Sequence, residues 1–170
     1  TSYGRDHLRH EILVGGISNA VFNGLIAWLL LRSGPALQWS GKHSFAVDVV
    51  ATGLLLPFIV ALIVIPLQRA KLGKGKLQAI DLGSTSIIQS IANRMPASTW
   101  KSALLFGLFG MCVIAPATLF GFYLAGVEQV APLNYAIFKG VWAGLVAAVL
   151  VVPMVLIALR GPGPASAAVK

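Results

Sequence analysis

Four long stretches without a charged residue constrain the fold of this chain more than any other feature. They cover residues 12–31, 49–68, 102–127 and 140–159, and each contains at least 20 residues. A helix of about 20 residues, rising about 1.5 Å per residue, crosses the roughly 30 Å hydrocarbon core of a bilayer. The stretches are continuously apolar rather than alternating, which favours helices over the strands of a membrane barrel.

The composition agrees with a membrane protein. Of the 170 residues, 57% are hydrophobic and 11% are charged, whereas a soluble domain carries about 25% charged residues. We therefore expect an all-α polytopic membrane protein with two helical hairpins. We expect one membrane domain over residues 1–170, with spans at about 12–31, 46–68, 102–126 and 134–159.

Basic residues are unevenly divided between the connections. The two tails and the loop 69–101 carry ten of the 13 Lys and Arg residues, and the remaining three are Arg32, Lys42 and Lys139. Positive charge concentrates on the cytoplasmic side of a membrane. The sequence thus predicts an integral protein of the bacterial inner membrane with the loop and both termini in the cytoplasm. The net charge of +8 is explained by this topology, and no nucleic-acid partner is expected.

The loop 69–101 contains a helix signal of its own. Ser86 and Gln89 have the spacing of a capping box, and Pro96 marks the end of the segment. One face carries Ile87, Ile88, Ile91 and Met95, and the other carries Gln89, Ser90, Asn93 and Arg94. This pattern predicts a short amphipathic cytoplasmic helix, which either lies on the membrane surface or docks a partner protein.

Small residues recur at helical spacing in the first and fourth spans. The rows are Gly16, Ala20 and Gly24, and Gly140, Gly144 and Ala148. Small residues let helix backbones approach closely in a membrane, so we expect both rows to mark helix-packing surfaces. A shift of 91 residues also aligns Gly16 with Gly107, Gly53 with Gly144, Arg69 with Arg160 and Asp48 with Lys139. A two-span duplication would explain this, with its axis along the membrane normal.

Two pairs of polar residues are candidates for lining a solute site. Asp48 and Lys139 begin the second and fourth spans on the same side. They either reach the interface separately, form an interhelical ion pair, or line a vestibule for an ion or small solute. Asn19 and Asn23 share one face of the first span. They either hydrogen-bond across a helix interface or line a cavity.

His7, His10 and Glu11 precede the first span at helical spacing. Two imidazoles and a carboxylate could bind a divalent cation, but this trio is more typical of a solvated surface, so we predict no metal site. The sequence offers no phosphate-binding loop, cysteine pair or haem-type histidine cluster. We therefore expect neither a cofactor nor an enzymatic activity.

The segment Leu13-Val14-Gly15-Gly16-Ile17-Ser18-Asn19 resembles the first helix of GtrA-like four-span proteins. That resemblance implies a link to the movement of lipid-linked sugars across the bacterial inner membrane. It covers one helix in four, and residues 66–69 depart from the pattern of that family. No residue role is carried over from it, and it assigns the chain to no family.

These features favour a small permease-like membrane protein that moves a small or lipidic solute. Its lining residues would be Asn19, Asn23, Asp48 and Lys139. Because 170 residues leave little room for a translocation path, we expect a homo-oligomer or a place in a larger membrane complex. The alternative is a non-catalytic accessory subunit that packs against a larger membrane protein complex. In either case the lipid bilayer is the first partner.

Overall fold

A computed structural model describes residues 2–161 as a bundle of helices. The elements are α1 (Ser2–Leu31), β1 (Leu37–Gln38), α2 (Phe45–Gly73), α3 (Ile87–Arg94), α4 (Thr99–Phe109), the π-helix η1 (Gly110–Ile114), α5 (Ala115–Leu124), β2 (Gln129–Val130) and α6 (Pro132–Leu159). Helices α4, η1 and α5 are continuous. Within the described range, four helices are long and apolar enough to cross a membrane: α1, α2, α4–η1–α5 and α6. The predicted all-helical fold with four such helices is confirmed.

Helix α1 is longer than the predicted first span. It begins at Ser2, ten residues before the charge-free stretch, and includes Arg5 and Arg9. A charge-free stretch marks the part of a helix that suits hydrocarbon, whereas backbone hydrogen bonding continues into the polar region beyond it. The start of the charge-free stretch is therefore not the start of the helix, and the predicted bounds of the membrane spans remain predictions.

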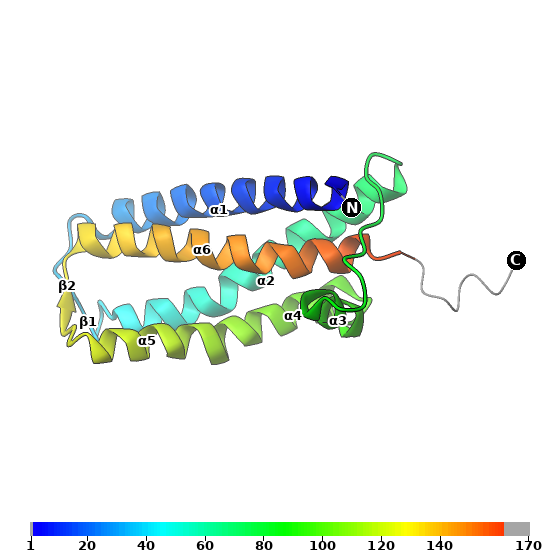
Figure 1. Ribbon diagram of the computed structural model, residues 1–170. Helices are drawn as coiled ribbons and strands as arrows, with labels where there is room; N and C mark the ends of the chain where they lie inside the picture. The colour runs from blue at the N-terminus through cyan, green and yellow to red at the C-terminus, as the bar shows by residue number, and fades with distance from the viewer. Residues whose placement is uncertain (1, 162–170) are drawn as a thin grey trace, which may run out of the picture.

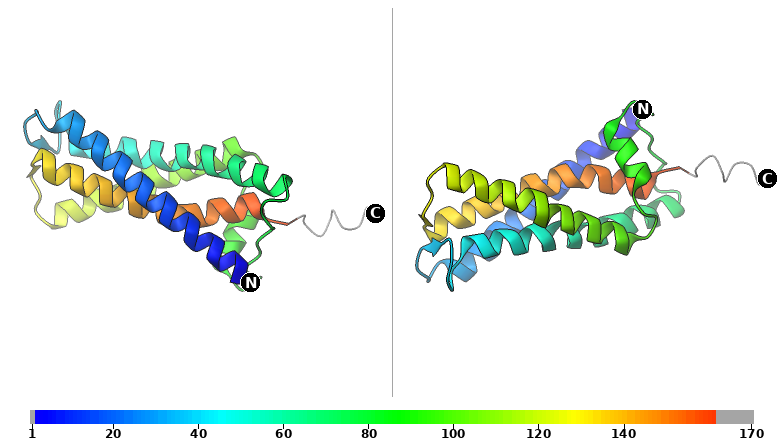
Figure 2. Two further views of the ribbon diagram at one scale, coloured as in Figure 1. Left: turned by 90° about the horizontal axis from the view of Figure 1, so that it is seen from above. Right: turned by 90° about the horizontal axis from the view of Figure 1, so that it is seen from below.

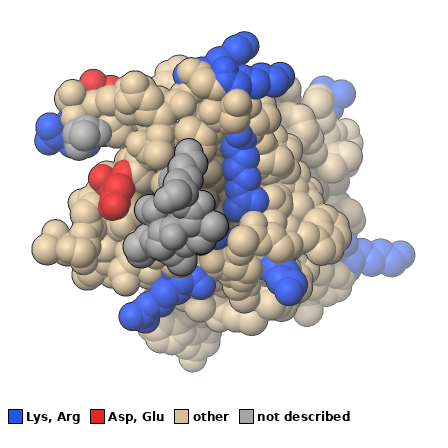
Figure 3. Space-filling model, turned by 90° about the vertical axis from the view of Figure 1, so that its right-hand side faces the viewer, with Lys and Arg blue, Asp and Glu red and all other residues tan. Residues whose placement is uncertain are grey.

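The long helices lie side by side, and the connections gather at the two ends (Figure 1). One end holds α3, the start of α1 and the end of α6, and we call it the α3 end. The other holds β1 and β2, which pair antiparallel, and we call it the β end. Lys and Arg side chains surround the α3 end (Figure 3). The predicted grouping of basic residues at one end is therefore present in the fold.

The helices do not pack in chain order. Helix α1 crosses over α6 and packs along it (Figure 2), while α2 packs against α4, η1 and α6. The two spans of each expected hairpin, α1 with α2 and α4–η1–α5 with α6, contact each other little. The two hairpins expected from the sequence are therefore not two packed pairs, because close backbone approach, rather than chain connection, selects the partner of each helix.

Small residues form the contact between α1 and α6. A Cβ atom added to Gly144 would lie 2.7 Å from Cβ of Ala20 and 2.8 Å from the carbonyl oxygen of Gly16. A Cβ atom added to Gly24 would lie 3.2 Å from Cα of Gly140. The two rows of small residues noted in the sequence thus face each other, and backbone touches backbone along this seam.

A second seam joins α2 to η1. Gly53 and Gly110 lie so close that a Cβ atom on Gly110 would overlap the carbonyl oxygen of Gly53 and lie 2.8 Å from Cγ of Pro57. The π-helix η1 ends two residues before Pro116, whose ring nitrogen donates no hydrogen bond. A wider π-turn accommodates this loss and brings the Gly110 backbone against α2.

The packing has an approximate two-fold pattern. Helix α1 packs on α6 as α4–η1–α5 packs on α2, and α2 meets α6 between the two pairs. If the first span is exchanged with the third and the second with the fourth, the same pairs of helices are in contact. The same exchange maps β1 onto its partner β2. The predicted axis along the helices fits this arrangement, while the duplication itself remains a prediction.

We predict that Gly110→Ala strongly destabilises the protein, whereas Gly121→Ala does not. The added methyl group at residue 110 collides with backbone, and overpacking of this kind costs about 1–3 kcal/mol or more. At Gly121, also within the third span, the same methyl group meets nothing within 4 Å. Thermal unfolding of the two variants in detergent measures the difference. Equal midpoints would contradict the proposed seam.

Candidate functional site

One charged residue of α2, Asp48, meets the one charged residue of α6, Lys139, at the β end. Nζ of Lys139 lies 2.9 Å from Oδ1 and 2.8 Å from Oδ2 of Asp48. The hydroxyl group of Tyr135 donates a hydrogen bond to Oδ2 of the same carboxylate. The geometry is therefore that of the interhelical ion pair considered from the sequence, completed by a tyrosine that the sequence analysis did not select.

The local fold holds Asp48 in the first turn of α2. Ser44 caps this helix by accepting a hydrogen bond from the backbone N–H of Val47, and its own hydroxyl donates to the carbonyl of Trp39. The indole N–H of Trp39 in turn donates to the carbonyl of Val127 in the other connection. A carboxylate in the first turn of a helix is also favoured by the helix dipole.

The ion pair lines a cleft of about 320 Å³ at the β end. The cleft is bordered by α1, α2 and the 41–44 segment, and its lining residues are Ile26, Ala27, Leu30, Leu31, Leu37, Gly41, Lys42, His43, Ser44, Val47, Asp48, Ala51 and Lys139. The Asp48 side chain keeps 36% of its surface exposed and Lys139 keeps 14%. The pair is thus both a helix–helix contact and the polar part of an open cleft with apolar walls.

Asn19 and Asn23 lie on α1 but are not among the residues that line this cleft. Their side-chain nitrogens donate to carbonyl oxygens of their own helix, 2.8 Å to Gly15 and 3.0 Å to Asn19 respectively. These bonds differ from the interhelical ones considered from the sequence. Asn23 precedes Ile26 and Ala27 by three and four residues, so its face of α1 continues from the cleft toward the α3 end.

The histidines before the first span are not assembled into a metal site. His7 lies 2.9 Å from the side-chain oxygen of Gln68 and 3.9 Å from Glu11, while His10 is exposed. Among residues 2–161, no group of three or more His, Cys, Asp and Glu side chains could hold a metal ion. Gln68 does not stand out in the sequence, but it is almost fully buried and its bond to His7 ties α1 to α2.

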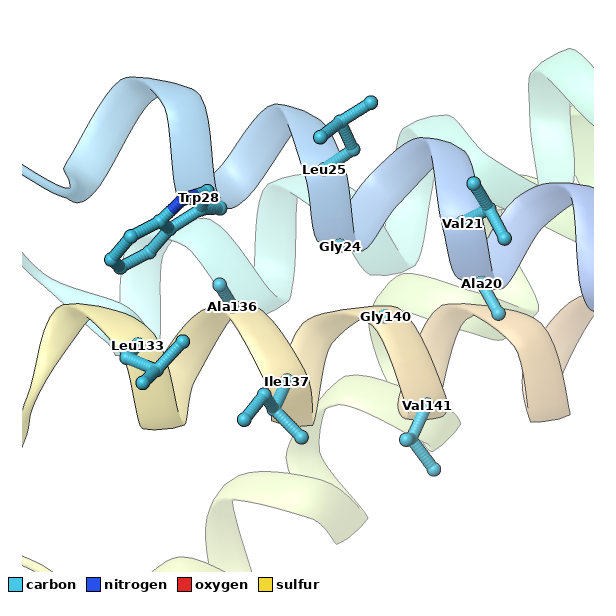
Figure 4. Close-up of a pocket in the computed structure, with 10 residues that line it drawn as sticks. All are labelled: Ala20, Val21, Gly24, Leu25, Trp28, Leu133, Ala136, Ile137, Gly140 and Val141. Atoms are coloured by element: carbon cyan, nitrogen blue, oxygen red, sulfur yellow. The ribbon is translucent and has the colours of Figure 1, made fainter.

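A second hollow lies between α1 and α6, but it is apolar (Figure 4). It has a volume of about 420 Å³, and Gly24 and Gly140 lie where its two helices approach. Its lining is aliphatic apart from Trp28, whose indole carries a single N–H donor. This groove can accommodate hydrocarbon but has no charged group to orient a polar solute. The cleft with Asp48 and Lys139 is therefore the better candidate site.

We predict a coupling free energy of about 1 kcal/mol between Asp48 and Lys139 in a double-mutant cycle with Asp48→Asn and Lys139→Gln. Partial exposure of the carboxylate keeps this value below that of a fully buried pair. Chemical unfolding in detergent gives the four stabilities. Glu128→Gln, which removes an exposed acid from the same end, serves as the control and should show no coupling to Lys139. A coupling free energy of zero between Asp48 and Lys139 would show that their contact does not stabilise the protein.

Comparison with known proteins gives no functional assignment. No protein-family model matches the chain, and no curated protein and no solved structure matches it. The resemblance of residues 13–19 to GtrA-like proteins is thus not accompanied by a family match.

Proposed function

We propose that this is a small permease-like integral membrane protein that moves a lipidic solute, with the cleft at the β end as its binding site. The observation that carries the proposal is a pair of opposite charges on α2 and α6 that lines a cleft with otherwise largely apolar walls. Ionised groups within membrane helices are costly and commonly mark solute paths.

The chemistry of the cleft favours an amphipathic solute. Ile26 and Leu30 of α1 and Val47 of α2 supply apolar contact for a hydrocarbon part. Asp48 and Lys139 supply an acceptor and a donor for a polar head, and Lys42 adds a cation in the 41–44 segment. A solute with both parts satisfies both kinds of wall, whereas a small ion leaves the apolar walls without a partner.

The distribution of charge gives the orientation in this proposal. Nine described Lys and Arg residues lie in α1, the 69–101 segment or at Arg160, toward the α3 end, which we assign to the cytoplasm of a bacterial inner membrane. The cleft would then face the outer side. Helix α1, which buries only Gly4, Leu8 and Ala27, presents a long apolar face to lipid or to a second copy of the chain.

We predict that proteoliposomes containing the protein translocate a fluorescent phospholipid analogue faster than protein-free liposomes. Asp48→Asn and Ile26→Trp should each lower this rate several-fold, the first by removing the charge and the second by filling the cleft. The measurement is the loss of fluorescence when dithionite reduces the labels that reach the outer leaflet.

Leu25→Trp is the matched control for the flux experiment. It adds the same side chain at the neighbouring position of α1 but points to the apolar groove, so the rate should stay at the wild-type value. If liposomes with the wild-type protein translocate the phospholipid analogue no faster than protein-free liposomes, this lipid is excluded as a solute. Equal loss in Leu25→Trp and Ile26→Trp would exclude the cleft as the site.

The accessory-subunit hypothesis is favoured by the exposure of α1. This helix buries three of its 30 residues within the chain, fewer than α2 or α6. If α1 packs against a larger protein, extraction in mild detergent at native abundance should yield a particle with a partner at fixed stoichiometry. A permease acting alone should yield only copies of this chain, so the mass of the particle separates the two functions.

A further inference from the structure

Helix α3 presents its isoleucine side chains away from the bundle. Gln89 and Ala92 are 3% and 0% exposed, whereas Ile87 and Ile91 are 77% and 53% exposed. An amphipathic helix that packs on a protein core normally buries its apolar face there. The opposite orientation of α3 leaves an isoleucine surface for an apolar environment outside the chain.

Several hydrogen bonds hold α3 in this orientation. Nη1 of Arg160 donates to the carbonyl oxygens of Ala92 and Met95, 3.3 and 3.0 Å away, at the C-terminal end of α3. The buried side chain of Gln89 accepts from the backbone N–H of Leu82 at 3.1 Å. Cations at helix C-termini are electrostatically favourable, so Arg160 ties α3 to the end of α6.

A polar pocket of about 340 Å³ lies beside α3. Its lining residues are Asp81, Gly83, Ser84, Gln89, Ser90, Asn93 and Arg94. Asp81 accepts one hydrogen bond, 2.8 Å from the backbone N–H of Gly83. Within the described part of the chain, neither Asp81 nor Arg94 forms an ion pair. The pocket therefore holds one positive and one negative group that do not neutralise each other by direct contact.

This pocket adjoins the isoleucine surface. Arg94 follows Ile91 by three residues and Ile87 by seven, so the three side chains lie along one stripe of α3. The assignment of Arg94 to the opposite face, made from the sequence pattern, was therefore wrong. Trp100, at the start of α4, is also largely exposed at this end and packs edge-on against Phe58 with ring centroids 5.3 Å apart. Exposed apolar side chains, an indole and an arginine are the residues typical of the headgroup region of a bilayer.

We infer that the pocket beside α3 binds the headgroup of a zwitterionic aminophospholipid. The phosphate group fits the guanidinium of Arg94, which can bind it bidentately, and the ammonium group fits the carboxylate of Asp81. Ser90 and Asn93 offer additional hydrogen bonds. The exposed side chains of Ile87 and Ile91 offer contact for the acyl chains. A lining with one cation and one anion suits a neutral headgroup better than one with net negative charge. This inference is independent of the cleft at the β end.

Native mass spectrometry of the delipidated full-length protein tests the inference by titration with phosphatidylethanolamine, phosphatidylcholine and phosphatidylglycerol. The wild-type protein should bind phosphatidylethanolamine about fivefold more tightly than the other two. Arg94→Gln should weaken the binding of all three lipids, because each has a phosphate. Asp81→Asn should remove the preference over phosphatidylcholine, because a quaternary ammonium cannot donate a hydrogen bond.

Two comparisons identify the source of the ligand and the specificity of the effect. Ile87→Ser should weaken binding of the intact lipid but not of soluble glycerophosphoethanolamine; equal loss of both would overturn the role of the acyl chains. Lys74→Gln, which removes a cation at the same end but outside the pocket, should leave binding unchanged. Wild-type binding by both Arg94→Gln and Asp81→Asn, or a preference for phosphatidylglycerol, would overturn the inference.

Discussion

Direct contact between helix backbones is the interaction on which this bundle depends. Lipid tails are as apolar as leucine, so helices in a membrane associate through close packing rather than through the exclusion of water. Two such contacts organise the chain, Gly144 against Gly16 and Ala20, and Gly53 against Gly110. They pair α1 with α6 and α2 with the third span, and the meeting of α2 and α6 joins the two pairs into one bundle.

The polar features follow from that pairing. Because α2 meets α6, Asp48 at the start of α2 reaches Lys139 on α6, and also Tyr135, which lies one turn before Lys139. Because α1 packs along α6 and contacts α2 little, the space between α1 and α2 at the β end is left as a cleft beside this pair. The same packing places the end of α6 next to α3. There Arg160 donates a hydrogen bond to the carbonyl of Ala92, and the carbonyl of Leu159 accepts one from the backbone N–H of Ile80.

Much of the fold follows from the sequence, because single-helix properties are local. Charge-free length predicts the four long helices, and Ser86 and Pro96 predict α3. The partners of each helix could not be predicted, because rows of glycine and alanine show that a face packs closely without showing against which helix. The orientation of α3 could not be predicted either, because it depends on contacts with Arg160, which is far from α3 in the sequence, and with Leu82, which lies outside the helix.

The candidate site could be predicted only in part from the sequence. Asp48 and Lys139 stand out in the sequence as charges at the starts of apolar spans, but Tyr135 becomes informative only once α2 and α6 are known to meet. Its one signal is its position four residues before Lys139, on the same face of α6. Asn19 and Asn23 stood out for the same reason as the charges, yet their side-chain nitrogens bond to their own helix, an option that every helical asparagine has.

The pairing of Asp48 with Lys139 has an evolutionary consequence if the two halves descend from one ancestral hairpin. The residues are 91 positions apart, the same spacing that aligns the halves. Two identical ancestral subunits would have carried the same residue at both positions, and equal charges facing each other across a symmetry axis repel. Fusion into a single gene removes that restriction, because each position can then mutate alone. Attraction across the former axis is an asymmetry that a dimer of two identical chains cannot encode.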